Sequence, residues 1–218
     1  IVSVKDFRPG MTNRTRSIQE EKSMNKILAD MHTHTIASGH AYATLTEMCK
    51  EAANKGLEIY GITEHSSGIP GTCADLYFKN LGVVPRDLFG LDLRLGAEIN
   101  IIDYNGTLDL GQEYIDRLDF VIAGIHSVCY KFGSKEENTA AIINAIKNPN
   151  VNIISHPDDG RCPLDYEALV QAAKEYHVLL EINNNALRDK NRKNVKENQK
   201  LIIENCKKYN HPFIMGSD

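Results

Sequence analysis

Residues 27–35, ILADMHTHT, join a short apolar run to two histidines that are separated by one residue. Such a run is typical of a buried strand, and the polar residues begin where that strand is expected to end. On an extended segment, side chains two residues apart point to the same side, so His32 and His34 can reach one metal ion together. This stretch therefore predicts a strand with metal-binding chemistry at its carboxyl end.

Six further apolar runs follow, and amphipathic stretches separate most of them. The predicted strands are 27–31, 57–63, 93–97, 120–124, 151–155, 178–182 and 213–216. This alternation is the pattern of βα units and predicts an α/β fold with a mostly parallel sheet. Periodicity alone leaves open whether the sheet is doubly wound and open or closed into a barrel.

Four helices are predicted between these strands. Thr44 and Glu47 form a capping box before the first helix, which Gly56 would end, and Ser134 and Glu137 form a second capping box. A third helix is predicted after Pro163 and a fourth over 195–209. The links from the second to the third strand and from the third to the fourth are less regular, and no helix is placed in them.

Potential metal ligands follow nearly every predicted strand. They are His32, His34, His40, His65, Glu98, His126, His156 and Asp218. A single histidine beside an apolar run is weak evidence, but this repetition at the expected carboxyl ends favours a barrel, because one site built from many strands requires their ends to converge. His177 and His211 precede strands instead, and we interpret them as structural.

The chemistry of this ligand set limits the choice of metal. Imidazole with carboxylate, without thiolate, suits zinc, manganese or iron better than magnesium or calcium, and we expect zinc. The number of ligands exceeds what one tetrahedral ion needs, so we expect at least two ions, about 3.5–4 Å apart and bridged by a carboxylate.

Composition bounds the remaining possibilities. The chain has 218 residues, 42% of them hydrophobic, which suits one domain; the polar residues 1–23 are expected to lie outside a barrel domain over 24–218. The formal net charge of −4 gives no basic field for nucleic acid. The sequence shows no membrane-spanning run and no secretory signal, and its five cysteines are scattered, so we expect a cytoplasmic protein with reduced thiols.

Seven segments together resemble the polymerase and histidinol phosphatase (PHP) family, and they are most similar to its small stand-alone phosphatases. They are DMHTHTIASGHAYATL, GITEH, GAEIN, FVIAGIHS, IISHP, LLEINNN and IMGSD, within residues 28–218. The resemblance implies a distorted (β/α)7 barrel with a trinuclear metal site. By that pattern His32, His34, Glu98 and Asp218 would hold one ion, Glu98 with His126 and His156 a second, and His40 with His65 the third.

Two positions depart from the family pattern. Residue 64 is Glu where the family more often has Asp, a change that we expect to be tolerated because His65 is the expected ligand. The family's last motif continues as Asp-x-His, whereas the sequence printed here stops at Asp218. We expect that the chain continues beyond this point, because otherwise the third ion would lack a ligand and the barrel its last helix.

The resemblance implies a phosphatase that acts on a small phosphorylated substrate. We expect a metal-bound hydroxide to attack phosphorus, since zinc can lower the pKa of bound water to about 7, and no protein nucleophile is predicted. Cations and amides in the loops after the strands are candidate substrate contacts, although solvated loop charge is the commoner explanation for the cations, and ordinary turn chemistry explains the asparagines equally well. They are Lys131, Arg161, Arg188, Arg192, Asn183 and Asn184.

Three alternatives remain open on the sequence. An amidohydrolase-like enzyme also begins with His-x-His, but His65 and Glu98 do not fit it. A PHP-type nuclease or phosphodiesterase is disfavoured by the acidic balance and by the absence of a basic, aromatic-lined groove. A non-catalytic metal-binding or regulatory module would keep the fold without the activity.

Overall fold

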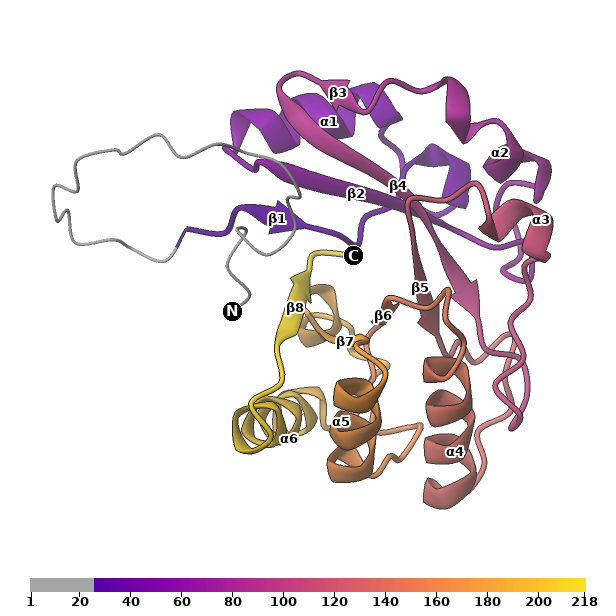
Figure 1. The fold of residues 1–218 in the computed structure, drawn as a ribbon, viewed down its shortest axis with the longest axis vertical. Coiled ribbons are helices and arrows are strands. Elements are labelled where there is room, and N and C mark those ends of the chain that lie inside the picture. The colour runs from indigo at the N-terminus through magenta and orange to yellow at the C-terminus, as the bar shows by residue number, and fades with distance from the viewer. Residues whose placement is uncertain (1–25) are drawn as a thin grey trace, which may run out of the picture.

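Residues 26–218 are described by a computed structural model, whose centre is a parallel sheet (Figure 1). Its strands follow the order β1-β2-β4-β5-β6-β7-β8. They are β1 (Ala29–Asp30), β2 (Ile59–His65), β4 (Leu91–Asn100), β5 (Phe120–Gly124), β6 (Ile153–Ile154), β7 (Leu179–Asn183) and β8 (Phe213–Gly216). Each overlaps one of the predicted runs, so the predicted strands are confirmed.

The sheet curls until its two edge strands, β1 and β8, lie near each other (Figure 1). The two strands do not form a ladder, but they are joined just beyond their ends. The Asp218 N–H donates to the His32 carbonyl at 2.8 Å, and the Ser217 N–H donates to Asp30 Oδ1 at 3.2 Å. The predicted α/β barrel is therefore confirmed as a nearly closed one, with all carboxyl ends at one mouth.

All four predicted helices are present and pack outside the strands. They are α1 (Leu45–Asn54), α4 (Lys135–Ile146), α5 (Tyr166–Glu175) and α6 (Val195–Lys208). Both predicted capping boxes form, with reciprocal hydrogen bonds between Thr44 and Glu47 and between Ser134 and Glu137. These caps fix where α1 and α4 begin, and thereby the lengths of the mouth loops before them.

The two irregular links contain only short elements. The first holds α2 (Leu76–Lys79), the 3-10 turn η3 (Leu81–Val83) and β3 (Asp87–Leu88), which pairs antiparallel with β4. The second holds α3 (Gln112–Ile115). Strand β3 was not predicted, because two residues are too short to show a periodic pattern. Two further 3-10 turns, η2 (Ile36–Ser38) and η4 (Asn185–Leu187), lie in mouth loops.

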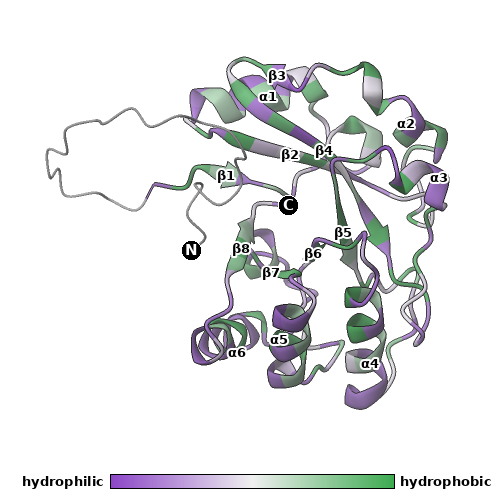
Figure 2. Ribbon diagram, viewed as in Figure 1, coloured by the Kyte–Doolittle hydropathy of each residue, from purple (hydrophilic) through white to green (hydrophobic). Residues whose placement is uncertain are grey.

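Apolar side chains form two layers that leave the mouth polar. The larger core fills the space between strands and helices, and the helices turn their hydrophilic sides outward (Figure 2). A smaller cluster around Phe120, Ile122 and Ile153 lies apart from that core, with Met31, Leu179 and Ile214 packed against it. Polar groups occupy the carboxyl ends of the same strands, so the cluster stabilises the strands that carry the site.

The proposed extension, residues 1–23, lies outside the described residues. Among residues 26–218, no helix combines the length and the apolar character needed to cross a bilayer.

Candidate metal centre

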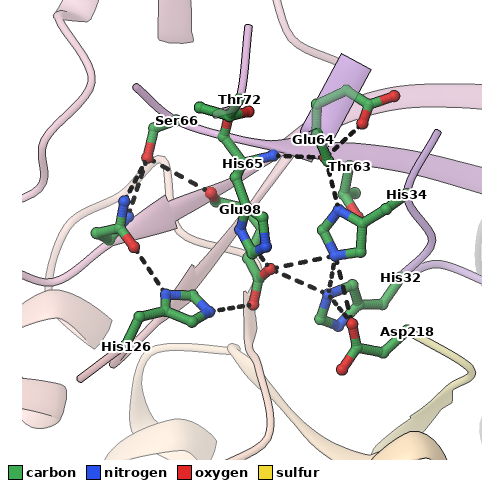
Figure 3. A network of polar contacts seen from close by, with 12 residues as sticks. His32, His34, Thr63, Glu64, His65, Ser66, Thr72, Glu98, His126 and Asp218 are labelled. Atoms are coloured by element: carbon green, nitrogen blue, oxygen red, sulfur yellow. Dashed lines mark hydrogen bonds and ion pairs between the residues drawn. The ribbon is translucent and has the colours of Figure 1, made fainter. Parts of the chain in front are cut away.

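All eight predicted ligands lie at the mouth, and most of them surround one carboxylate. Glu98, near the end of β4, is fully buried in the middle of the group (Figure 3). Its Oε1 lies 2.8 Å from His156 Nε2 and 3.3 Å from His126 Nε2. Its Oε2 lies near three more ring nitrogens: 3.0 Å from His65 Nδ1, 3.2 Å from His32 Nε2 and 3.4 Å from His34 Nε2.

Two atoms in this group have no hydrogen-bond partner among the described residues. They are Glu98 Oε2 and His65 Nδ1, both buried; they lie 3.0 Å apart as an ion pair but without the geometry of a hydrogen bond. A buried polar atom without a partner is costly in a folded protein. A divalent cation would satisfy both atoms, and a set of imidazoles around carboxylates is a donor set that zinc accepts. The residues present therefore fit a metal.

Three groups of side chains could each hold one ion. In each, one donor atom per residue lies within 4.8 Å of the others. The groups are His34, His40 and His65; His32, His34 and Asp218; and His65, Glu98 and His126. His34 and His65 each belong to two groups, so the division of ligands among ions that the resemblance implies stays a prediction. His156 lies outside these groups but contacts Glu98 directly.

The electrostatics of the mouth couple acids and imidazoles tightly. Burial alone would raise the pKa of Glu98, but His32, His126 and His65 lower it well below its usual value. Burial alone would lower the pKa of His32, but the carboxylates of Glu181 and Glu98 raise it well above its usual value. The carboxylates and the imidazoles thus stabilise each other's charged forms, and metal cations can take the place of the imidazole protons.

Buried acceptors behind three of the histidines hold the rings in place. His32 Nδ1 lies 2.7 Å from Glu181 Oε1, His34 Nδ1 lies 2.9 Å from Ser38 Oγ, and His126 Nδ1 lies 2.7 Å from Asn100 Oδ1. Each acceptor occupies the Nδ1 side, so each ring turns Nε2 toward the centre. Metal-binding histidines usually have such a second partner, which fixes the tautomer and the ring orientation.

Glu181 and Asn100 were not predicted, although the sequence carries a signal for both. Alternate residues of a strand share one face, so Asn100 lies on the face of Glu98. Glu181 is a charged residue inside the apolar run LLEIN, and it is fully buried. A side chain at Gly216 would overlap Glu181 Oε1, so the β8 backbone must approach this carboxylate closely.

The departure at position 64 has a structural role. Glu64 is fully buried and accepts hydrogen bonds from the Thr35 backbone N–H at 3.1 Å and from the Thr35 and Ser38 hydroxyls. Ser38 in turn contacts His34, and the His65 N–H donates to Ser38 Oγ at 3.2 Å. The Glu64 side chain therefore anchors η2 and holds two candidate ligands through one serine.

The predicted substrate contacts separate into groups. Arg192 is largely buried, and its Nη2 lies 3.9 Å from Asp218 Oδ2. Asn183 is buried and donates to Glu181 Oε2 at 3.1 Å and to Asp218 Oδ2 at 3.0 Å. Arg161 is bound by the carboxylate of the nearby Asp159. The exposed predicted contacts are Lys131, Arg188 and Asn184.

A pocket of about 320 Å³ lies beside the candidate ligands His34, His40 and Asp218. Its other walls include Tyr42 and Met48, so apolar surface adjoins the polar centre. This space can accept the organic part of a small molecule while its charged end faces the histidines.

Comparison with known proteins agrees with this architecture. The model of the PHP domain matches residues 30–207. A probable phosphatase of Caldicellulosiruptor saccharolyticus is 50% identical over 191 residues, which is 87% of this chain and 78% of that protein. A probable phosphatase of Acetivibrio thermocellus is 46% identical over 193 residues, 88% of this chain and 79% of that protein.

A solved structure shares the fold at low sequence identity. It is the histidinol phosphate phosphatase of Lactococcus lactis, in complex with zinc, L-histidinol and phosphate. The TM-score is 0.58 at 18% identity, over 87% of this chain and 85% of that one. From the family model and the two relatives together, we conclude that this chain belongs to the PHP domain family.

Proposed function

We propose that this chain is a metal-dependent phosphatase that hydrolyses monoesters of phosphoric acid, with zinc as its metal and His32, His34, His40, His65, Glu98, His126, His156 and Asp218 as the metal ligands. The observation that carries the proposal is the Glu98 carboxylate, which has five imidazole nitrogens within 3.4 Å. The relatives named probable phosphatase support the reaction class.

When bound, divalent ions would activate water and neutralise the charge of the phosphate oxygens. The chain's own part is to hold the ligands rigidly and to place the ester. Buried partners fix His32, His34 and His126, so little reorganisation is needed when a substrate arrives. The pocket beside His34 and His40 would take the alcohol part of the ester.

Arg192 is the strongest candidate for contact with the phosphate. Its guanidinium lies at 3.8 Å from Asp158, 3.5 Å from Asp189 and 3.9 Å from Asp218, measured between the closest ion-pair atoms. Arg192 Nη1 and Asp158 Oδ1 are buried without a hydrogen-bond partner among the described residues. Arg192 Nη2 is the nitrogen nearest the centre, at 3.9 Å from Asp218 Oδ2, and a guanidinium placed there could bind an anion through its N–H donors.

The variant Arg192→Gln tests this contact. A hydrogen bond to a charged group contributes about 1.5–3 kcal/mol, so we expect kcat/KM for an aryl phosphate to fall about 10- to 100-fold. Arg94→Gln is the matched control, because Arg94 forms an exposed pair with Asp92 on the outside of β4. Equal kinetics for the two variants would remove Arg192 from the proposed site.

The reaction class is tested with two aryl esters. We expect 4-nitrophenyl phosphate to be hydrolysed in preference to bis(4-nitrophenyl) phosphate, with activity lost to a chelator and restored by Zn²⁺. Preference for the diester would instead indicate a phosphodiesterase or nuclease. A purified chain that binds zinc but cleaves neither ester would favour the non-catalytic alternative.

A further inference from the structure

A carboxylate outside the ligand set organises the loop beside His126. Asp109 follows β4 in the chain and accepts three hydrogen bonds. Its Oδ1 accepts from Ser66 Oγ at 2.5 Å and from the Asn100 backbone N–H at 2.9 Å, and its Oδ2 accepts from Asn100 Nδ2 at 2.7 Å. Both of its oxygens are therefore used within the mouth.

This arrangement decides which way the Asn100 amide faces. A carboxylate only accepts hydrogen bonds, so the NH₂ group of Asn100 must face Asp109. The same NH₂ group also donates to Ser66 Oγ at 2.9 Å. Turning the amide around would place its oxygen against Asp109 Oδ2, two acceptors in contact. The oxygen Oδ1 therefore points the other way, to His126 Nδ1 at 2.7 Å.

The amide orientation in turn decides the tautomer of His126. Because Asn100 Oδ1 only accepts, Nδ1 of His126 must carry the hydrogen. In the neutral ring Nε2 then carries the lone pair, and this atom lies 3.3 Å from Glu98 Oε1 at the centre of the candidate site. A metal binds imidazole through such a lone pair.

We infer that Asp109 is a positioning residue for the metal centre, which acts through Asn100 to hold His126 in the Nδ1–H tautomer. The inference rests on the proposed function, in which His126 is a metal ligand. Asp109 acts two hydrogen bonds away from that ligand. Through Ser66 it also anchors the residue that follows His65, so one carboxylate links the β2 and β5 sides of the mouth.

The hydrogen bonds from Asp109 through Asn100 to His126 form a relay, and the variant Asp109→Asn tests it because the backbone limits how the new amide can turn. The Asn100 backbone N–H cannot turn, so residue 109 must keep an oxygen opposite it. The new NH₂ group then faces the Asn100 side chain and forces that amide to turn its own NH₂ group toward His126. We expect His126 to change to the Nε2–H tautomer, and Zn²⁺ affinity to fall about 10- to 100-fold.

Exchanging the two side chains should restore the relay. In Asn100→Asp with Asp109→Asn, the carboxylate at 100 accepts from His126 Nδ1 and from the new amide at 109. We expect Zn²⁺ affinity to return to within about threefold of the original value. Asp103→Asn is the matched control, since Asp103 lies in the same link and accepts hydrogen bonds from the Asn105 and Thr107 backbone N–H groups.

Two measurements on the full chain decide the inference: Zn²⁺ affinity by competition with a chromogenic chelator, and two-bond ¹H–¹⁵N correlations of the imidazoles after chelator treatment. The spectra are recorded at about pH 9, where an ordinary imidazole is neutral, and His126→Ala assigns the signal. We expect Nδ1–H in the original chain and in the exchanged variant, and Nε2–H in Asp109→Asn.

Either of two results would overturn the inference. One is Nε2–H in the original chain, a test that no folding defect can obscure. The other is a loss of affinity in Asp109→Asn that the exchanged variant does not recover while both remain folded by circular dichroism. If the original chain binds no Zn²⁺, the proposed function fails, but the spectra still test the relay.

Discussion

The histidines at the mouth of the barrel and those at its opposite end have different neighbours. At the mouth, neighbouring imidazole rings lie 4.4–5.9 Å apart between centroids, and the buried carboxylate of Glu98 lies among them. At the opposite end, His211 Nε2 donates to the Val178 carbonyl at 2.9 Å, and His177 is exposed. The interpretation of these two histidines as structural agrees with their positions.

This difference teaches that a histidine becomes a candidate ligand through its neighbours. The buried ring of His211 is hydrogen-bonded to the Val178 backbone carbonyl, so its Nε2 has a partner without any metal ion. At the mouth, by contrast, Glu98 Oε2 and His65 Nδ1 are buried without a hydrogen-bond partner among the described residues.

The largest effect is expected from Glu98→Gln, which removes the charge at the centre of the cluster. Without this carboxylate several imidazoles lose their common counter-charge, and a bound metal would lose a ligand. We expect hydrolysis of an aryl phosphate to fall by about a thousandfold or more, and bound zinc to decrease. Steady-state kinetics and elemental analysis measure both.

Glu204→Gln on the exposed side of α6 is the control for this substitution, and it should leave both quantities unchanged. Normal zinc content in Glu98→Gln would contradict the central position given to this carboxylate.

A smaller effect is expected from Glu181→Gln, which leaves the ligands intact but alters what holds them. Glu181 Oε1 binds His32, and Oε2 accepts from the His156 backbone N–H at 2.7 Å. An amide can accept on only one side, so one of these contacts is lost. We expect zinc affinity to fall about 10- to 100-fold, while Glu175→Gln on exposed α5 has no effect. Unchanged affinity would make Glu181 a structural residue only.

Acid is expected to weaken metal binding at the mouth. Burial opposes the charged forms of His32 and His34, but nearby carboxylates raise the pKa of both above the usual value of 6.5. A metal must displace those protons, so affinity should decrease as the pH falls, beginning above pH 6.5. Zinc titrations at several pH values measure this slope. An affinity independent of pH would contradict protonation at the cluster.

The smallest effect is expected at the opposite end, from His211→Gln. Burial lowers the pKa of His211 below 6.5, so the folded chain prefers the neutral ring. Its contribution to the free energy of unfolding is therefore present above the unfolded pKa and is lost as the pH falls through the folded pKa. The variant should weaken this pH dependence and change stability by about 1 kcal/mol or less, with zinc content unchanged. Loss of zinc in this variant would contradict the interpretation of His211 as a structural residue outside the metal centre.

The strands and the candidate metal ligands could be predicted from the sequence because the ligands follow directly after apolar runs. The run 27–31 and the histidines after it are adjacent in the sequence, and their spacing predicts which side chains share a face. Glu181 could have been found in the same way, as a charge inside a buried run. Asp109 could not, because a loop residue has no periodicity that points it toward Asn100, and only the folded link brings the two together.

The most direct test of the metal centre is a titration of the chelator-treated chain with buffered Zn²⁺, in which bound zinc and release of phosphate from 4-nitrophenyl phosphate are followed on the same sample. We predict that activity returns in step with zinc, to two or three equivalents per chain, and that His211→Gln follows the same curve. Full hydrolysis in the zinc-free chain, or zinc bound without any hydrolysis, would contradict the assignment of this mouth as a phosphatase centre.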